Sequence, residues 1–304
     1  MIDLEQFSRD HWGPLRRHTY RLTGSIVDAE DAVQETMLRA VEMGPALDSV
    51  GDPVEWLHVA ATEAALALLH EQPPLSLEAL ELPDLVQTAG PGGGDAAPLS
   101  GEEGWPGVDL PFLFPLQYME PEQRAVLVLR DAMEDGDRLA AAALSATLPE
   151  VFQLAEAAGR RRAEVRRRWG RHVPFSPLQD DPASARVFAR FTEALGLRDK
   201  ALLQAALLPE AEMVMNAGRR ESGQDFVATA CADTLGELGA DPRLTPVWLN
   251  GCRGLLAWER HPHRDEWRRG AALLVLCEGS HVRTVKWEMD GHILRSIQAE
   301  EPDK

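Results

Sequence analysis

The chemistry most evident in this sequence is the binding of phosphate groups by arginine side chains. Between Arg160 and Arg171 the chain carries seven arginines and one acid, Glu164. Guanidinium groups bind phosphates by displacing counterions, so such a run is typical of a nucleic-acid interface. The same block could instead balance acids elsewhere in the protein, and the sequence leaves both interpretations open.

The remainder of the chain opposes phosphate binding because it is acidic. Its 304 residues include 31 Lys+Arg and 49 Asp+Glu, which gives a formal net charge of −18. Between Arg39 and Arg124 lie 15 acids and no Lys or Arg. This distribution excludes non-specific nucleic-acid binding by the chain as a whole.

The composition is that of a globular protein, with 44% hydrophobic and 26% charged residues. No run approaches the ~18 apolar residues of a membrane span, and the acidic first ten residues do not resemble a secretory signal. Cys231, Cys252 and Cys277 are too far apart for a CxxC metal site, and their odd number does not suit a disulfide framework. We therefore expect a cytoplasmic protein without membrane contact, cofactor or metal.

Aromatic and histidine side chains concentrate in the last 60 residues, where they could line a pocket or fill a core. A histidine in a pocket can act as a general acid or base, whereas tryptophans at strand positions more often pack. His261-Pro262-His263 alone does not make a metal site. The residues concerned are Trp248, Trp258, Trp267, Trp287, His261, His263, His281 and His292.

Hydrophobic periodicity predicts a mainly helical first half. Apolar residues recur at a spacing of three to four over residues 1–71, with a break at Gly24-Ser25 and a new helix capped by Asp52. Three short helices are predicted over 122–130, 137–144 and from Pro149 into the arginine block. Their short connections are typical of a helix-turn-helix unit.

The second half is predicted to be an α+β domain. Helices fit residues 183–208, and strands fit 247–258 around Asn250-Gly251, 271–277 and 280–287. Asp290-Gly291 predicts a further hairpin turn, followed by a strand with Ile293 and Ile297 on one face. Stretches rich in Pro and Gly at 72–108 and 174–182 are predicted to be linkers that do not pack, at least partly mobile.

A specific resemblance lies in Tyr20–Val41, which reads YRLTGSIVDAEDAVQETMLRAV. This segment resembles region 2 of extracytoplasmic-function sigma factors, and Met119–Asp131, MEPEQRAVLVLRD, resembles the start of their region 4. From about residue 183 the chain resembles the SnoaL-like α+β cone appended to one subgroup. The resemblance implies a region 2-like domain at 1–71, a linker at 72–109, a region 4-like helix-turn-helix at 110–173 and a SnoaL-like domain at 183–304.

The resemblance also implies partners and sites. Region 2 of this family docks on the clamp helices of the RNA polymerase β′ subunit, and the matching residues here are Asp28, Asp31, Gln34, Glu35, Leu38 and Arg39. Promoter DNA is the second implied partner, with candidate contacts at Gln153, Arg160, Arg161, Arg162, Arg166 and Arg167. Candidate contacts of the SnoaL-like domain with the sigma regions are Asn216, Gly218, Arg219, Asp303 and Lys304.

The chain departs from the family pattern where DNA would be bound. In the promoter-melting helix, Glu63 replaces the usual Asn, Ala67 an Asp, and His70 and Glu71 two arginines. Carboxylates repel the phosphates that such a helix meets. In the helix-turn-helix, Ser145 stands where a glycine usually makes the turn, a position that often needs a positive φ.

Three functions are therefore compared. The first, which we favour, is a sigma-factor-like transcription regulator that binds core RNA polymerase and is modulated by its SnoaL-like domain. The second is a polymerase-binding decoy or adaptor that has lost promoter recognition. The third is an enzyme, either a cyclase or a hydrolase, or a ligand-binding protein that takes a small molecule in the C-terminal cone.

Overall fold

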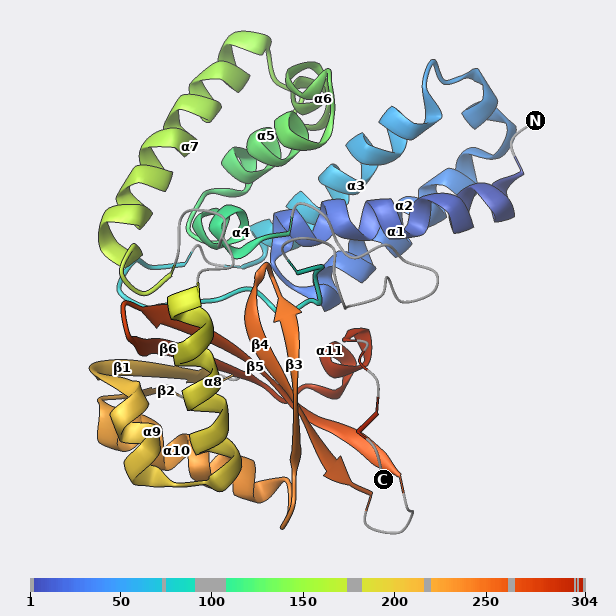
Figure 1. The fold of residues 1–304 in the computed structure, drawn as a ribbon. Helices are drawn as coiled ribbons and strands as arrows, with labels where there is room; N and C mark the ends of the chain where they lie inside the picture. Colours follow the sequence, from blue (N-terminus) through green and yellow to red (C-terminus); the bar gives the residue numbers. More distant parts are fainter. Residues whose placement is uncertain are drawn as a thin grey trace. The chain divides into compact units, whose positions relative to one another are not determined.

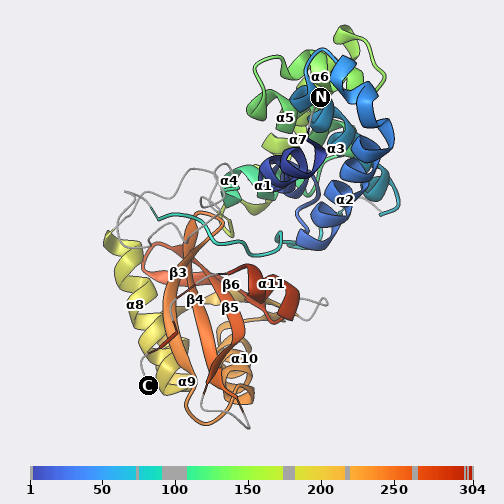
Figure 2. The same ribbon diagram turned by 90° about the vertical axis from the view of Figure 1, so that its right-hand side faces the viewer.

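The computed structural model describes residues 3–72, 75–90, 108–173, 182–215, 220–261, 266–297, 299 and 301–302. The chain forms two compact units. The helical unit comprises Met1–Pro83 and Phe112–Trp169, and the sheet unit comprises Asp84–Pro111 and Gly170–Lys304. Figures 1 and 2 show both units in two views.

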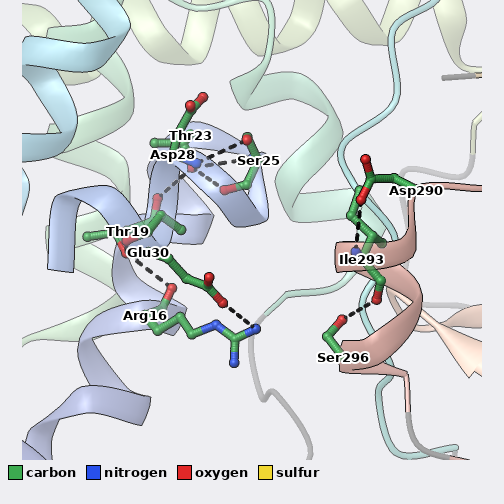
Figure 3. Close-up of polar contacts among 10 residues, drawn as sticks. Arg16, Thr19, Thr23, Ser25, Asp28, Glu30, Asp290, Ile293 and Ser296 are labelled. Carbon is green, nitrogen blue, oxygen red and sulfur yellow. Dashed lines mark hydrogen bonds and ion pairs between the residues drawn. The ribbon is translucent and has the colours of Figure 1, made fainter. Parts of the chain in front are cut away.

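The first helices of the helical unit begin and end at local capping signals. Gly24, with φ of +71°, ends the first helix, and the Ser25 hydroxyl accepts from the Asp28 amide at 3.2 Å to start the second (Figure 3). The Asp52 carboxylate accepts from the Val54 amide at 2.8 Å, which confirms the predicted cap. The elements are α1 (Leu4–Thr23), α2 (Ile26–Met43), the 3-10 helix η1 (Gly44–Ser49) and α3 (Pro53–His70).

The predicted helix-turn-helix is present in the second part of the helical unit. Its two helices are α6 and α7, which pack on α5 through the buried side chains of Val126, Leu139 and Val151. Ser145 in the turn has φ of +49°, which confirms the expected conformation. The elements are α4 (Leu110–Leu116), α5 (Pro121–Ala132), α6 (Gly136–Ala143) and α7 (Leu148–Trp169).

The two sets of helices share one hydrophobic core. Leu22 of α1 and Ala65 of α3 are fully buried in the same cluster as Val128 of α5. An ion pair at 2.5 Å joins Glu55 of α3 to Arg138 of α6. The segments that resemble regions 2 and 4 therefore pack as one unit.

The sheet unit contains a six-stranded mixed sheet. Its strand order is β2-β1-β6-β5-β4-β3, in which β1 and β6 are parallel and all other neighbours are antiparallel. Its strands are β1 (Leu207–Met215), β2 (Arg220–Ser222), β3 (Arg243–Leu249), β4 (Cys252–Arg260), β5 (Trp267–Glu278) and β6 (His281–Glu288). Its helices are α8 (Pro182–Leu197), α9 (Lys200–Ala206), α10 (Gln224–Glu237) and α11 (Gly291–Ser296).

Helices α8, α9 and α10 pack against the sheet through a large apolar cluster (Figure 1). Phe191 of α8, Leu235 of α10 and Trp287 of β6 are fully buried in it. The predicted fold class, a helical N-terminal half followed by a C-terminal α+β domain, is confirmed. Within the described ranges, no helix is long and apolar enough to cross a membrane.

The predicted hairpin at Asp290-Gly291 is wrong. The Asp290 carboxylate accepts from the His292 amide at 2.7 Å and from the Ile293 amide at 3.3 Å, so it caps α11 instead (Figure 3). Ile293 and Leu294 are adjacent and both buried in α11, whereas a strand would point them to opposite faces. An aspartate before a glycine serves either a tight turn or a helix start, and here the helix start prevails.

The turn of the helix-turn-helix yields a stability prediction. Replacing Ser145 with glycine removes the Cβ that is disfavoured at positive φ, so the helical unit should gain about 1 kcal/mol. Thermal unfolding followed by calorimetry measures this change. Ser145→Ala retains the Cβ and serves as the control. An equal gain in both variants would contradict the conformational explanation.

Candidate functional site

One face of α2 is exposed along most of its length. Asp31, Gln34, Glu35 and Leu38 are all exposed, and their spacing places them on this face. The opposite face of α2 is buried in the core of the helical unit. The structure therefore brings these four predicted polymerase-binding residues together on one surface, which we call the α2 face.

The other two predicted residues, Asp28 and Arg39, are held by neighbouring side chains. The Asp28 carboxylate accepts from Gln72 Nε2 at 3.1 Å. The Arg39 guanidinium donates to Glu35 at 3.0 Å and to Glu63 of α3 at 3.4 Å. Asp28 and Arg39 therefore lie at the edges of the α2 face, where these contacts hold their side chains in place.

Sequence reasoning named Leu38 but missed Val27 and Val41, the other two apolar residues of the α2 face. Val27 is 49% exposed, Leu38 60% and Val41 56%. Together with Asp31 and Gln34 they continue the spacing of three to four residues along the helix. This spacing is visible in the sequence, but apolar residues at helical spacing usually indicate a buried stripe. An acidic face with exposed apolar side chains suits a protein partner, because apolar groups contribute most of the free energy of association.

The exposed face of α3 carries acids and no cation of its own. Glu63, Ala67, His70 and Glu71 are exposed. Glu63 pairs with Arg39, and His70 Nε2 lies 2.8 Å from the Glu122 carboxylate of α5. Two of the four residues that replace the family's DNA-contacting types, Glu63 and His70, thus form contacts inside the helical unit.

Side chains at the start of α7 cap the helix itself. The Glu150 carboxylate accepts from the Thr147 backbone amide at 2.7 Å and from its hydroxyl at 2.8 Å. These hydrogen bonds, the backbone one foremost, lower the pKa of Glu150. The bond from the Thr147 amide to the Glu150 carboxylate is one half of a capping box, which gives Glu150 a structural role. Gln153 remains exposed on the next turn.

The five arginines of α7 that were predicted to contact DNA divide into two groups. Arg161 donates to the Tyr118 carbonyl oxygen and to Glu164, both at 2.7 Å, and Arg160 pairs with Glu156. These two guanidinium groups stabilise the helical unit.

The second group is exposed. Arg162, Arg166 and Arg167 form no ion pair within the described part of the chain. The block therefore does not balance the acids of α2 or α3 in the described structure, and three of the six predicted DNA contacts remain available as free cations on α7.

The cluster beneath α8, α9 and α10 has no acid or base. Its described members are apolar side chains and Cys231, whose thiol pKa burial raises to about 12. His261, His281 and His292 lie outside this cluster, and no group of three metal-ligating residues occurs among the described residues. His263 lies outside the described residues. The buried charged side chains of the sheet unit stand outside this cluster, at Arg283, Lys286 and Glu288 of β6.

The predicted linker is attached to the tip of the β3–β4 hairpin. The Val86 amide donates to Asn250 Oδ1 at 3.2 Å, and the Asn250 amide donates to the Val86 carbonyl at 2.9 Å. On the far side of the linker, Asn250 Nδ2 donates to the Val108 carbonyl at 3.4 Å, and the Leu110 amide donates to the Asn250 carbonyl at 2.8 Å. Asn250 is fully buried and holds both ends of the linker.

Further contacts extend this attachment. The Thr88 amide donates to the Trp248 carbonyl at 3.0 Å, and the Thr88 hydroxyl accepts from the Gly251 amide at 2.9 Å. Leu85 and Val86 are buried. The prediction that this stretch does not pack is therefore wrong for residues 84–90 and for Val108. Residues 91–107 and 174–181 lie outside the described residues.

The residues predicted to contact the sigma regions from the SnoaL-like domain are not among those that the structure describes. Asn216, Gly218 and Arg219, as well as Asp303 and Lys304, lie outside the described residues. The described hydrogen bonds between the linker and the sheet include those of the Asn250-Gly251 turn.

Comparisons with known proteins agree with this geometry. Residues 8–72 match the family model described as Sigma-70 region 2, which covers α2 and α3. Residues 8–72 of the helical unit therefore have the sequence character of a sigma-70 region 2 domain.

The chain is also 30% identical over 269 residues to the ECF RNA polymerase sigma factor SigG of Mycobacterium tuberculosis, from strains CDC 1551 / Oshkosh and ATCC 25618 / H37Rv. The alignment covers 79% of this chain and 70% of each relative. The chain belongs to the extracytoplasmic-function RNA polymerase sigma factors.

A solved structure extends the likeness to the whole fold. The crystal structure of the Mycobacterium tuberculosis extracytoplasmic function sigma factor SigJ superposes with a TM-score of 0.61 at 20% identity, covering 98% of this chain and 100% of that one. The predicted family, the SnoaL-like α+β fold of the C-terminal domain and the class of sigma-factor-like transcription regulator are confirmed. Family membership implies core RNA polymerase as a partner.

The attachment of the linker can be tested at Asn250. Asn250→Gly keeps the positive φ of this turn but removes both side-chain hydrogen bonds, which leaves the buried Val86 amide without its acceptor. The cost should be about 1–3 kcal/mol. Hydrogen exchange at the Val86 amide should accelerate, as mass spectrometry or NMR would show. Ser280→Ala, in the β5–β6 turn, is the control, and unchanged Val86 protection in Asn250→Gly would contradict the assignment.

Proposed function

We propose that this chain binds core RNA polymerase through the α2 face, with the clamp helices of the β′ subunit as its docking site. The observation that carries this proposal is the exposure of Asp31, Gln34, Glu35 and Leu38 on one side of a helix that is buried on its other side. Acids there would pair with cations of the partner, while Val27 and Val41 extend the apolar contact. Since core polymerase is cytoplasmic, the protein acts in the cytoplasm.

Promoter DNA contacts are proposed for α7 alone. Arg162, Arg166 and Arg167 offer exposed cations to phosphates, which position DNA without reading its sequence. Gln153 is the exposed amide closest to the start of α7, where a recognition helix meets base edges. The acidic surface of α3 contributes nothing to phosphate binding.

The SnoaL-like domain is proposed to modulate this activity through the linker. Residues 84–90 and 108–110 join the region 2-like segment (1–71) to the region 4-like segment (110–173), and both are bound to the Asn250 turn. A linker held at both ends has less freedom than a flexible chain of its length. Attachment to the domain at 183–304 thus restricts how the two sigma segments can separate.

A decoy or adaptor is the second candidate function. It is favoured by Glu63 and Glu71 on α3, together with the use of Glu150 as a cap where base contacts are expected. Such a protein would retain the α2 face and occupy polymerase without opening a promoter. The sigma-factor-like regulator and the decoy differ only in whether they bind DNA. Measuring polymerase binding and DNA binding separately therefore distinguishes these two functions.

Charge reversal tests the α2 face. Asp31→Lys combined with Glu35→Lys should weaken binding to core RNA polymerase at least tenfold, because two attractive pairs become repulsive at the interface. Surface plasmon resonance with immobilised core enzyme measures the affinity. Glu193→Lys, an exposed reversal on α8, is the matched control. Equal affinities for the double variant and the control would refute binding through this face.

The salt dependence of DNA binding tests α7. Arg166→Ala with Arg167→Ala should lower the affinity of the holoenzyme for promoter DNA and reduce the slope of log K against log salt by about 2. Fluorescence anisotropy at several salt concentrations gives the slope. An unaltered slope would remove both arginines from the interface. Polymerase binding without any DNA affinity at low salt would favour the decoy.

A further inference from the structure

Two histidine rings meet inside the helical unit, where α1 packs against α3. His18 of α1 is only 3% exposed, and the ring of His58 on α3 lies edge-on to it, with 5.1 Å between the ring centroids. We call these two residues the histidine pair. A histidine in water gains a charge at mildly acidic pH, so a buried pair at a helix contact can make that contact depend on pH.

Hydrogen bonds determine which nitrogen of each ring carries its proton. The Thr62 hydroxyl donates its single hydrogen to the His58 carbonyl at 2.7 Å, so it can only accept from His18 Nε2, which lies 2.8 Å away. In His18 the proton is therefore on Nε2, and Nδ1 has a lone pair. His58 Nδ1 lies 2.9 Å from the Val54 carbonyl oxygen, which cannot donate, so the proton of His58 is on Nδ1.

A second proton on His18 has no acceptor. It would add to Nδ1, which is buried without a hydrogen-bond partner in the described structure. A buried donor and a buried charge are both unfavourable when they are unpaired. Burial accordingly lowers the pKa of His18 well below its ordinary value, and the charges of His58 and Arg21 lower it further. The nearby carboxylate of Asp131 on α5 is already paired with Arg21.

The other ring of the pair is also held neutral. Burial and the charge of His11 on α1 lower the pKa of His58 more than the hydrogen bond to Val54 and the charge of Asp52 raise it. The remaining neighbours are the buried side of α2, which is apolar except for Thr36, and the ion pair of Arg138 on α6 with Glu55 on α3.

We propose that the histidine pair makes the packing of α1 on α3 sensitive to acid, so that this contact opens when a ring takes up a second proton. In the open state both rings are in water and titrate near pH ~6.5. The stability that depends on two neutral rings is therefore complete above about pH 6.5 and is lost as the pH falls below it.

Opening of this contact also affects the α2 face. Leu15 of α1, Val33 of α2 and Leu57 of α3 are buried in one cluster, so α2 loses its support when α1 and α3 separate. Acid thereby lowers the fraction of the chain that can dock on polymerase. This consequence rests on the docking proposed above, whereas the opening itself does not, and the following test uses no polymerase.

Hydrogen exchange of the full chain, followed by mass spectrometry at about pH 7.5 and about pH 5.5, tests the histidine pair. After correction for the intrinsic pH dependence of exchange, the protection of α1 and α3 amides should fall at least tenfold. Each proton that the closed state excludes contributes about tenfold over this interval. Peptides of α10 in the sheet unit are the internal reference. Equal changes in α1, α3 and α10 would overturn the proposal.

Variants assign the effect to the two rings. His18→Gln retains an Nε2–H donor for Thr62 but cannot be protonated, so it should remove roughly tenfold of the acid-dependent loss of protection. His58→Asn retains a donor for the Val54 carbonyl and tests the second ring independently. His281→Gln, at the start of β6, is the matched control and should behave as the wild type does. The same pH dependence in the wild type and in both pair variants would refute the assignment.

Discussion

The buried guanidinium of Arg124 determines how the helices of the N-terminal half meet. It binds carbonyl oxygens at the end of α1 and on the connection between α4 and α5. The last carbonyls of a helix have no partner within it and carry the negative end of the helix dipole. A cation placed where such carbonyls converge satisfies them together. Without them, burial of the charge would be strongly unfavourable, so the two sigma segments depend on each other for this contact.

A second polar contact organises the sheet unit in a comparable way. Asn250 lies at a hairpin tip with φ of +48°, a conformation that asparagine tolerates better than most residues. Its side-chain amide has both a donor and an acceptor, so one residue binds Val86 on one side and Val108 on the other. An aspartate could not donate, and a glycine could do neither. The turn thus forms the hairpin and at the same time gathers the linker.

Features encoded by neighbouring residues were predictable from the sequence. The cap at Asp52, the turn at Ser145 and the exposed side of α2 all arise from spacing and residue type. The Asp290-Gly291 pair was mispredicted because a hairpin and a helix start share this dipeptide and differ only in the residues after it. The adjacent residues Ile293 and Leu294 are both buried, and this favours the helix start over the hairpin. The error arose where a local signal had two physical solutions.

Packing of the linker was not predictable for a different reason. Its Pro and Gly content correctly excludes helices and long strands, but it does not exclude hydrogen bonding to a partner 164 residues away. Leu80, Leu85 and Val86 are too few to form a core alone, yet each is buried. Similarly, the roles of Glu63 and Glu150 as internal partners required coordinates, since the sequence shows only that they are acids.

The positions of the charged residues explain more about this protein than its net charge of −18 does. Glu63 of α3 forms an ion pair with Arg39. The positive charge of Arg39 is therefore neutralised within the helical unit instead of attracting phosphates. Exposed cations remain on α7, where screening at physiological salt confines their influence to about 8 Å. The same screening weakens the repulsion between DNA phosphates and the net negative charge of the chain beyond that distance. If core polymerase docks on the α2 face as proposed, it must bring α7 within this distance of the phosphates before these arginines can contribute to binding.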